Sequence, residues 1–159
     1  MKLIKLSNRL ETLKNLIDYG ASIADIGSDH GCLPVYLAQN GYAKKIIASD
    51  ISAASLKTAQ QNAEKYNVAD IINFIVAPGL TGIKKNDVDT IVIAGLGGET
   101  IIDILKDSPW TKNNLKLILQ PQTKINLLCR FLYDNEYKIE KTFFTYDRGK
   151  RYTVIVSKN

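Results

Sequence analysis

The sequence is poor in cysteine and has no long apolar run. Its two cysteines, Cys32 and Cys129, do not have metal-ligand spacing, and two isolated cysteines are typical of a protein in a reducing compartment. We expect both to be small core residues. No apolar run approaches the ~20 residues that a membrane-spanning helix needs, and residues 1–5 are too short for a signal peptide. These absences predict a cytoplasmic protein with no metal site and no membrane partner.

The sequence also lacks internal repeats, low-complexity tracts and linkers, so we expect a single domain over residues 1–159. A formal net charge of +5 makes an anionic partner such as RNA plausible without requiring one. The basic residues are scattered, and the small clusters at 44–45, 84–85 and 148–151 are also explained by a solvated surface. The oligomeric state stays open, with a monomer favoured.

A dinucleotide-binding glycine fingerprint is missing where one would be expected. A short apolar strand pattern around residues 23–26 ends at Gly27, and the fingerprint needs another glycine two positions later, where this chain has Asp29. A carboxylate there would repel a pyrophosphate. A ligand with an ammonium and a sulfonium group, such as S-adenosylmethionine (SAM), tolerates both Asp25 and Asp29. Alternatively, the two carboxylates only cap the turn and the helix that follows it.

Strand patterns alternate with helical patterns along the chain, which indicates a parallel sheet with helices on both faces. Leucines and isoleucines at helical spacing predict an N-terminal helix over about residues 6–19, with Asn8 and Glu11 as a capping box. Further helices are expected at 34–40, 52–66, 99–106 and 124–133, the last one capped by Thr123. Further strands are expected at 45–49, 71–76, 90–94 and 115–119, and a hairpin at 137–146 and 152–156 around Asp147-Arg148-Gly149-Lys150. The sequence thus predicts an α/β, Rossmann-like fold with a mostly parallel seven-stranded sheet and a C-terminal antiparallel hairpin.

Ligands of such a sheet bind at the carboxyl ends of its strands. Asp50 ends the second strand, 23 positions after Gly27, where a carboxylate can accept hydrogen bonds from the two ribose hydroxyls of an adenosine. It could instead complement the dipole of the next helix. Gly95, Gly97 and Gly98 follow the fourth strand and would let a flat base lie against the backbone, although tight helix–strand packing also explains them.

Two amides, Gln120 and Gln122, follow the fifth strand of the pattern. Each side chain presents an acceptor and two donors, which can pair with the N6/N7 edge of adenine or with a ribose. We therefore expect both amides to face the ligand cleft.

Five segments, in the same order, resemble motifs of the bacterial tRNA (adenine(22)-N1)-methyltransferases. They are Leu6-Ser7-Asn8-Arg9-Leu10, Ala24-Asp25-Ile26-Gly27-Ser28-Asp29-His30 with Leu33-Pro34, Ile93-Ala94-Gly95-Leu96-Gly97-Gly98, Leu117-Ile118-Leu119-Gln120-Pro121 and Gly149-Lys150-Arg151-Tyr152. The order of elements is similar to that of the class I SAM-dependent methyltransferases over nearly the whole chain. The resemblance implies methyl transfer from SAM, the cofactor, to N1 of an adenine in the D-arm region of tRNA, the partner.

The resemblance also implies roles for the matched residues. Asp25, Gly27 and His30 would hold the methionine end of SAM and Asp50 its ribose, although His30 could instead be a structural turn histidine. Leu96 to Gly98 would border the target base. The residues expected to bind the cofactor are Asp25, Gly27, Ser28, His30, Asp50, Ile51, Ala77, Ala94 and Gly95, and those expected to bind the substrate are Arg9, Leu96, Gly97, Gly98 and Gln120.

Asp29 is the candidate catalytic residue. Adenine N1 is a neutral lone-pair nucleophile, so no base is needed to create it, but the methylated product is cationic. A carboxylate that accepts a hydrogen bond from the exocyclic amine binds more tightly as that charge develops. The position of Asp29 in the turn beside the expected sulfonium motivates this hypothesis.

Two departures from the family pattern leave other functions open. The family usually carries a C-terminal helical segment that helps to hold tRNA, and this chain ends at Asn159, just after its last predicted strand. Ala77-Pro78-Gly79 stand where such enzymes often have a polar residue near the adenine of SAM. The alternatives are a SAM-dependent methyltransferase acting on a small molecule or protein, and a non-catalytic domain that binds SAM or RNA. The chain also lacks the Asn-Pro-Pro-aromatic motif of exocyclic-amine methyltransferases.

Overall fold

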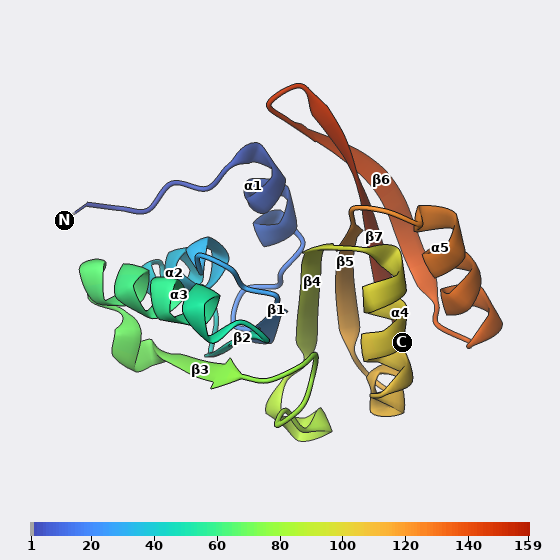
Figure 1. Ribbon diagram of the computed structural model, residues 1–159, viewed down its shortest axis with the longest axis horizontal. Coiled ribbons are helices and arrows are strands. Elements are labelled where there is room, and N and C mark those ends of the chain that lie inside the picture. Colours follow the sequence, from blue (N-terminus) through green and yellow to red (C-terminus); the bar gives the residue numbers. More distant parts are fainter. Residues whose placement is uncertain (1) are drawn as a thin grey trace.

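The computed structural model describes residues 2–159, which fold around one mixed sheet (Figure 1). Across these residues the strand order is β3-β2-β1-β4-β5-β7-β6. The parallel strands are β1 (Ser22–Ile26), β2 (Lys45–Asp50), β3 (Ile72–Val76), β4 (Thr90–Leu96) and β5 (Lys116–Pro121). β7 (Lys150–Lys158) is antiparallel to both β5 and β6 (Ile139–Asp147). The predicted Rossmann-like fold with its closing hairpin is confirmed.

Helices cover both faces of the sheet (Figure 1). α1 (Asn8–Asn15), α2 (Cys32–Gln39) and α3 (Ala53–Lys65) pack on one face, and α4 (Gly98–Lys106) and α5 (Ile125–Asp134) on the other. Short 3-10 helices, η1 (Ala69–Ile71), η2 (Lys85–Asp87) and η3 (Pro109–Lys112), lie in the connections. Because successive strand residues point to opposite faces, Ile91 and Ile93 enter the core beneath α4 and α5, whereas Val92 enters the other core. This is why the central strands are apolar at nearly every position.

The N-terminal helix is shorter than predicted. Ser7 is the N-cap of α1, because its hydroxyl accepts a hydrogen bond from the Leu10 N–H at 3.4 Å, so the predicted capping box of Asn8 and Glu11 is wrong. The helix ends at Asn15. Leu6 and Ile17 lie outside it but still pack into the core on this face of the sheet. The apolar spacing therefore extended beyond the residues that are helical.

The predicted cap of the last helix is also wrong. Lys124, with a φ of 54°, occupies the N-cap position of α5, and in the described chain no side-chain hydrogen bond caps this helix. The carbonyl of Thr123 instead accepts a hydrogen bond from the Gly98 N–H at 2.9 Å. Thr123 thus connects the start of α5 to the start of α4.

The C-terminal hairpin turns through two residues in the left-handed region. Arg148 has a φ of 51° and Gly149 a φ of 74°, and Asp147 pairs directly with Lys150. Positive φ at both central residues is the geometry of a tight hairpin turn whose twist matches the strands. The predicted hairpin is therefore confirmed; β7 is longer than expected, whereas β6 begins two residues later and ends one residue later than expected.

The register of the parallel strands brings the first turns to one edge of the sheet. Ile26 in β1 lies opposite Ser49 in β2 and Ile93 in β4. Gly27 then leaves the strand with a φ of 72°, a conformation that favours glycine. The N–H groups of Gly27 and Ser28 both donate to the Ser49 carbonyl, at 2.9 and 3.1 Å. The turn after β1 is therefore held against the end of β2.

Gly98 begins α4 at a point of close backbone contact. A Cβ atom at this position would lie 2.5 Å from the carbonyl oxygen of Thr123 and 2.7 Å from that of Lys124. Backbone atoms of this kind cannot rotate aside as the end of a side chain can. The packing interpretation of Gly98 therefore explains why a glycine stands here.

We predict that Gly98→Ala lowers the free energy of unfolding by about 1–3 kcal/mol, the usual cost of overpacking. The expected sign is opposite to that of an ordinary glycine-to-alanine change within a helix, which is stabilising by up to about 1 kcal/mol. Thermal unfolding measures the effect. Gly97→Ala is the matched control, because a Cβ there would meet two rotatable hydroxyls, that of Thr123 at 3.1 Å and that of Thr100 at 3.9 Å, and no backbone atom within 4 Å. If Gly98→Ala lowered the free energy of unfolding by no more than Gly97→Ala does, the prediction would be wrong.

Candidate functional site

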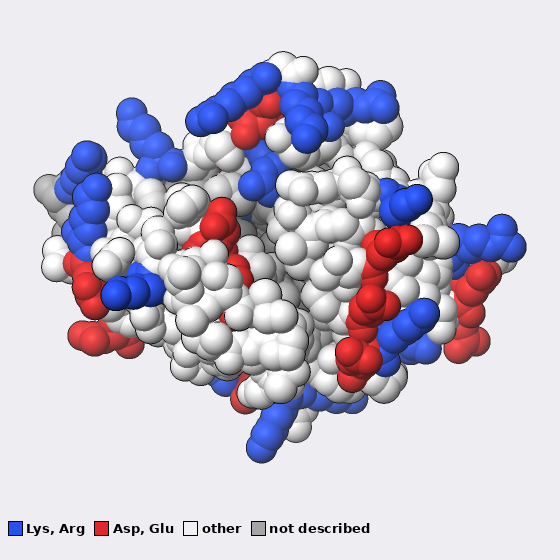
Figure 2. Space-filling view, viewed as in Figure 1, with Lys and Arg blue, Asp and Glu red and all other residues white. Residues whose placement is uncertain are grey.

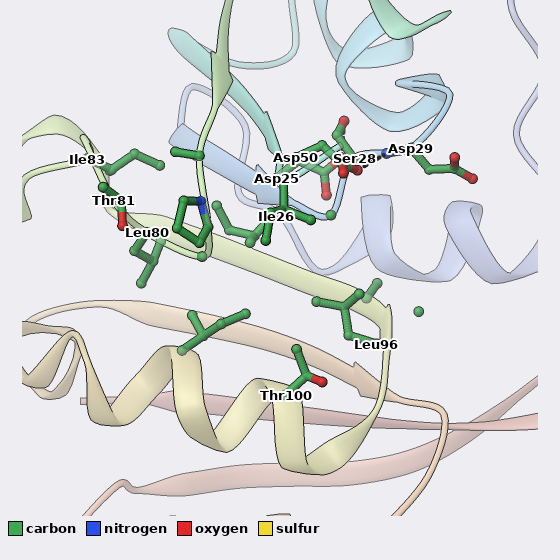
Figure 3. Close-up of a pocket in the computed structure, with 18 of the residues that line it drawn as sticks. Asp25, Ile26, Ser28, Asp29, Asp50, Leu80, Thr81, Ile83, Leu96 and Thr100 are labelled. Carbon is green, nitrogen blue, oxygen red and sulfur yellow. Dashed lines mark hydrogen bonds between the residues drawn. The ribbon is translucent and has the colours of Figure 1, made fainter. Parts of the chain in front are cut away.

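A cavity of about 900 Å³ lies at the carboxyl ends of β1, β2 and β4. Figure 2 shows the hollow near the middle of the face in view, and Figure 3 shows Asp25, Ser28 and Asp50 converging on one part of it, with Leu96 and Thr100 across from them. Every residue predicted to bind the cofactor lines this cavity, as do Asp29 and two of the predicted substrate contacts, Arg9 and Leu96. The structure thus brings these residues together; their individual roles stay predictions.

Asp25 supplies a buried carboxyl group to the cavity. It is only 6% exposed, and its Oδ2 accepts a hydrogen bond from the Ser28 hydroxyl at 3.0 Å. Burial raises the pKa of Asp25 to about 7; the Ser28 hydrogen bond and the Arg9 charge oppose this rise, and the Asp50 charge adds to it. Asp25 is therefore poised between its neutral and ionised forms near neutral pH.

Asp50 is held by two backbone donors. Its Oδ1 accepts from the Ser52 N–H at 2.9 Å, and its Oδ2 accepts from the Asp29 N–H at 3.1 Å. Ser52 is the N-cap of α3, so the carboxylate also lies next to the positive end of that helix. Both interpretations of Asp50 are therefore compatible: the helix terminus and the β1 turn orient a carboxylate that still has lone pairs directed to a ligand.

Asp29 and His30 lie at the exposed rim. Their side chains are 67% and 64% exposed, and Asp29 Oδ2 lies 3.7 Å from His30 Nε2. Asp29 has a φ of 53°, a left-handed conformation that aspartate tolerates better than most residues. Figure 3 shows its side chain directed away from Asp25 and Asp50. Asp29 is thus available to a molecule that approaches from solvent.

Apolar contact dominates the wall next to Asp50. Ile51 lines the cavity with 74% of its surface exposed, an unusual state for an isoleucine. The Ala77 N–H already donates to the Asp50 carbonyl at 3.1 Å, and Pro78 has no N–H to offer. A flat base bound here would therefore gain most from apolar contact with Ile51.

Gln120 does not face the cavity, contrary to expectation. It is fully buried; its Oε1 accepts from Arg9 Nη1 at 3.0 Å and from the Gly95 N–H at 3.2 Å, and its Nε2 donates to the Pro121 carbonyl at 3.1 Å. Its amide therefore positions Arg9 and Gly95, which do line the cavity. Direct contact between Gln120 and a substrate is not supported by this geometry.

Gly97 and Gly98 also lie outside the cavity lining, while Gln122 belongs to it. The backbone contact of Gly98 with the loop before α5 accounts for that glycine without a ligand. Of the three predicted borders of the target base, only Leu96 reaches the cavity. Its side chain packs against the turn after β1, since a Cβ on Gly27 would lie 3.3 Å from Leu96 Cδ2.

No sequence pattern indicated the far part of the cavity, which runs along α4 and the connection after β3. Side chains there come from three segments: Leu80, Thr81 and Ile83; Thr100, Asp103, Ile104 and Asp107; and Ser108 and Trp110. None of these belongs to a recognisable motif. They share the cavity because α4 packs beside the β3–β4 connection, where a Cβ on Gly79 would lie 3.1 Å from Ile104 Cγ1.

The part of the chain that the structure describes contains neither a metal-binding cluster nor a helix that could span a membrane. No group of three or more histidine, cysteine, aspartate or glutamate side chains is arranged to hold a metal ion in residues 2–159. Over the same residues, no helix has the length and apolar character needed to cross a membrane.

Known methyltransferases are similar to this chain in sequence and in fold. A family model for a methyltransferase domain matches residues 6–155. The tRNA (adenine(22)-N(1))-methyltransferase of Bacillus subtilis is 38% identical over 99% of this chain, which spans 66% of that relative. The crystal structure of the B. subtilis M1A22 tRNA methyltransferase TrmK has a TM-score of 0.91 at 36% identity and covers 98% of this chain, which spans 67% of that one.

The structure of M. capricolum TrmK, solved in complex with S-adenosyl-homocysteine, has a TM-score of 0.85 at 33% identity, with 96% of this chain and 68% of that chain covered. The present chain therefore spans about two thirds of the length of the relatives that it matches. The match extends over nearly all of this chain and includes the five motif segments and the cavity. The chain belongs to the bacterial tRNA (adenine(22)-N1)-methyltransferase family of class I SAM-dependent methyltransferases.

Proposed function

We propose that this chain uses SAM to methylate N1 of an adenine in tRNA, at adenine 22 in the D-arm region. The observation that carries the proposal is the pairing of Asp25 and Asp50 in one ligand-sized cavity. In the described residues, neither carboxyl forms an ion pair or a hydrogen bond with a cationic side chain. Such a cavity suits a ligand that carries its own positive charge.

SAM matches the groups that line the cavity. Asp25 would bind the ammonium group, and the remaining lone pairs of the Asp50 carboxylate would accept the two ribose hydroxyls. Ile51 would lie against a face of the adenine, where Ala77 and Pro78 offer no free backbone donor. When bound, SAM supplies a methyl group activated by its sulfonium.

The target adenine must be unpaired or extruded, because N1 lies on its Watson–Crick edge. Leu96 provides an apolar wall near the turn after β1, and Asp29 provides a carboxylate at the rim. We assign Asp29 the hydrogen bond from the exocyclic amine of the adenine. That bond becomes charge-assisted as positive charge develops on the base, so it stabilises the transition state more than the bound substrate. Alignment of N1 with the methyl group supplies most of the remaining rate enhancement.

The first test is transfer of labelled methyl from SAM to unmodified bacterial tRNA, with the product nucleoside identified by chromatography and mass. We expect 1-methyladenosine in the wild-type reaction, and its loss when the target adenine is replaced by guanine in the transcript. SAM binding with no labelled tRNA, or a methyl group found at another atom, would refute the proposal.

A graded series at position 29 tests the catalytic role. Asp29→Asn keeps an acceptor and tolerates the left-handed backbone, so turnover should fall about tenfold, the difference between a charged and a neutral hydrogen bond. Asp29→Ala removes the acceptor, and turnover should fall about 100-fold or more. SAM affinity, measured by calorimetry, should change less than threefold in both variants, because the Asp29 group that contacts Asp50 is its backbone N–H.

Asp70→Asn is the control for this series, since Asp70 is an exposed aspartate in η1 and lies outside the cavity. It should leave both turnover and SAM affinity unchanged. Equal losses of turnover and SAM affinity in the Asp29 variants would show that Asp29 acts in cofactor binding and not in catalysis.

Asp25 makes SAM affinity depend on pH. Since the pKa of Asp25 is raised to about 7, the carboxyl is mostly neutral at pH 5.5 and becomes ionised as pH rises through 7. An α-amino group stays protonated below about pH 7.7, so the attraction grows over this window. The association constant for SAM should therefore rise by up to about tenfold per pH unit between pH 5.5 and 7, and then level off.

Calorimetry in two buffers of different ionisation enthalpy measures both the affinity and the proton released on binding near pH 6.5. Asp25→Asn should bind SAM weakly and without this pH dependence. It should also be more stable than the wild type at pH 8. Because the pKa of Asp25 is raised from 3.8 to about 7 in the folded state, the wild type loses stability as pH rises between these two values, and the full cost is present at pH 8. A flat wild-type profile between pH 5.5 and 7 would contradict the assignment of Asp25.

A further inference from the structure

The β6–β7 hairpin extends past the edge of the sheet that holds the cavity. The pairing of β5 with β7 ends where Leu119 lies opposite Ile155, and β7 continues from there to Lys150. These outer residues pair only with β6, which is the last strand of the sheet. Figure 1 shows this hairpin projecting beyond the helices at the top of the view. The face of the hairpin that carries Phe144 and Tyr146 is therefore open to a partner, whereas α1 lies against the other face at Thr145.

One face of this overhang carries exposed aromatic rings beside an arginine. Phe144 is 53% exposed and Tyr146 59% exposed, and both lie on β6 with one residue between them. Arg151 pairs with Tyr146 across the strands, and its guanidinium carbon lies 4.3 Å from the centroid of the Phe144 ring. A planar cation stacked beside two open rings resembles the platforms on which unpaired nucleic-acid bases stack.

The other face leads toward the cavity. Lys150 Nζ lies 5.2 Å from the centroid of the Tyr152 ring, and the guanidinium carbon of Arg9 lies 5.6 Å from the same centroid. Arg9 lines the cavity. Thr12 of α1 and Thr145 of β6 share a hydrogen bond of 2.8 Å, which holds α1 against the hairpin. Positive groups therefore run from the hairpin to the rim of the cavity.

The opposite side of the cavity is acidic. Glu99, Asp103 and Asp107 are exposed along α4 at helical spacing, and the latter two line the cavity. Figure 2 shows these opposite charges plainly: blue side chains gather at the top of the view, and a red column lies on the right over α4. A polyanion would be repelled by α4 and attracted by the hairpin.

We propose that the hairpin tip, defined as Phe144, Tyr146, Arg148, Lys150 and Arg151, binds the RNA substrate of this enzyme. Arg148, Lys150 and Arg151 contact its phosphates, and an unpaired base near the target adenine stacks on Phe144 or Tyr146. The proposal rests on the proposed function and extends it, because it names the surface that holds the RNA and the kind of RNA that this surface prefers. Exposed rings can stack only on bases that are not already in a helix.

Paired charge variants test the phosphate contacts. Lys150→Gln with Arg151→Gln should weaken the binding of unmodified tRNA at least tenfold at low salt. The slope of log K against log salt should become less steep by about 1.4–1.8, the value for two lost phosphate contacts. Lys84→Gln with Lys85→Gln is the matched control, since it removes two exposed charges near η2, outside both the tip and the cavity lining. That control should keep the wild-type affinity and slope.

Phe144→Leu with Tyr146→Leu tests stacking. Leucine keeps the apolar character of these strand positions but removes the ring faces. We expect tRNA affinity to fall about fivefold or more with an unchanged salt slope, and affinity for a fully duplex RNA to stay the same. SAM affinity and thermal unfolding, measured on the same samples, should match those of the wild type in all the hairpin variants.

The outcomes separate this inference from the proposed function. Methyl transfer to tRNA at wild-type affinity in the hairpin variants would overturn the inference while the proposed function stands. A loss of the same size in the Lys84 and Lys85 control would also overturn it, because the effect would then follow net charge alone. If wild type binds tRNA through the tip but transfers no methyl group, the inference holds and the proposed function fails.

Discussion

The cavity depends on keeping two carboxyl groups close together without a cation bonded to either. Removing Asp25 from water disfavours its charge, and Asp50 adds repulsion. The surrounding chain offsets this cost with the Ser28 hydroxyl, the Arg9 guanidinium and two backbone N–H groups on Asp50. These contributions are enough to hold the site in shape but leave Asp25 with a raised pKa. A cationic ligand supplies the positive charge that the two carboxyl groups lack. Its binding therefore reduces the electrostatic cost of keeping Asp25 ionised beside Asp50.

The cavity is built from segments that lie far apart in the sequence. Gln120, from the buried end of β5, holds both the Gly95 N–H and the Arg9 guanidinium. Arg9 comes from α1, more than a hundred residues away in sequence, and influences Asp25 electrostatically without bonding to it. A buried amide can fix a guanidinium in this way because both of its polar atoms have partners, which avoids the cost of an unpaired polar group. The position of the Arg9 charge thus depends on the packing of Gln120 in the core.

The sequence predicted the sheet and the part of the cavity at the carboxyl ends of β1, β2 and β4, because both depend on local patterns. Central strands must be apolar on both faces, and Gly27 and Asp50 mark the turns that follow β1 and β2. The prediction for Gln120 was wrong because the expected strand ended at residue 119, two residues before β5 ends at Pro121. Inside the strand, the side chain of Gln120 points into the core and not into the cleft. Trp110 and Asp107 had no local signal, since they join the cavity only through the packing of α4 beside the β3–β4 connection. Helix limits failed for a related reason: Leu6 and Ile17 pack like helical residues without being helical.

A methyltransferase that acts on RNA must satisfy two opposite electrostatic demands at one edge of its sheet. A cationic donor requires acidic groups in the cavity, and these same groups repel the phosphates of the polymer that must approach it. The chain separates the two demands in space. Carboxylates lie in the cavity and along α4, whereas Arg148, Lys150 and Arg151 lie on a hairpin that overhangs the edge and reaches the rim through Tyr152 and Arg9. The backbone of an RNA can then lie on the basic overhang while one neutral base enters the acidic cavity. In the proposed binding mode, this separation of charge gives the two long terminal strands a role beyond completing the sheet.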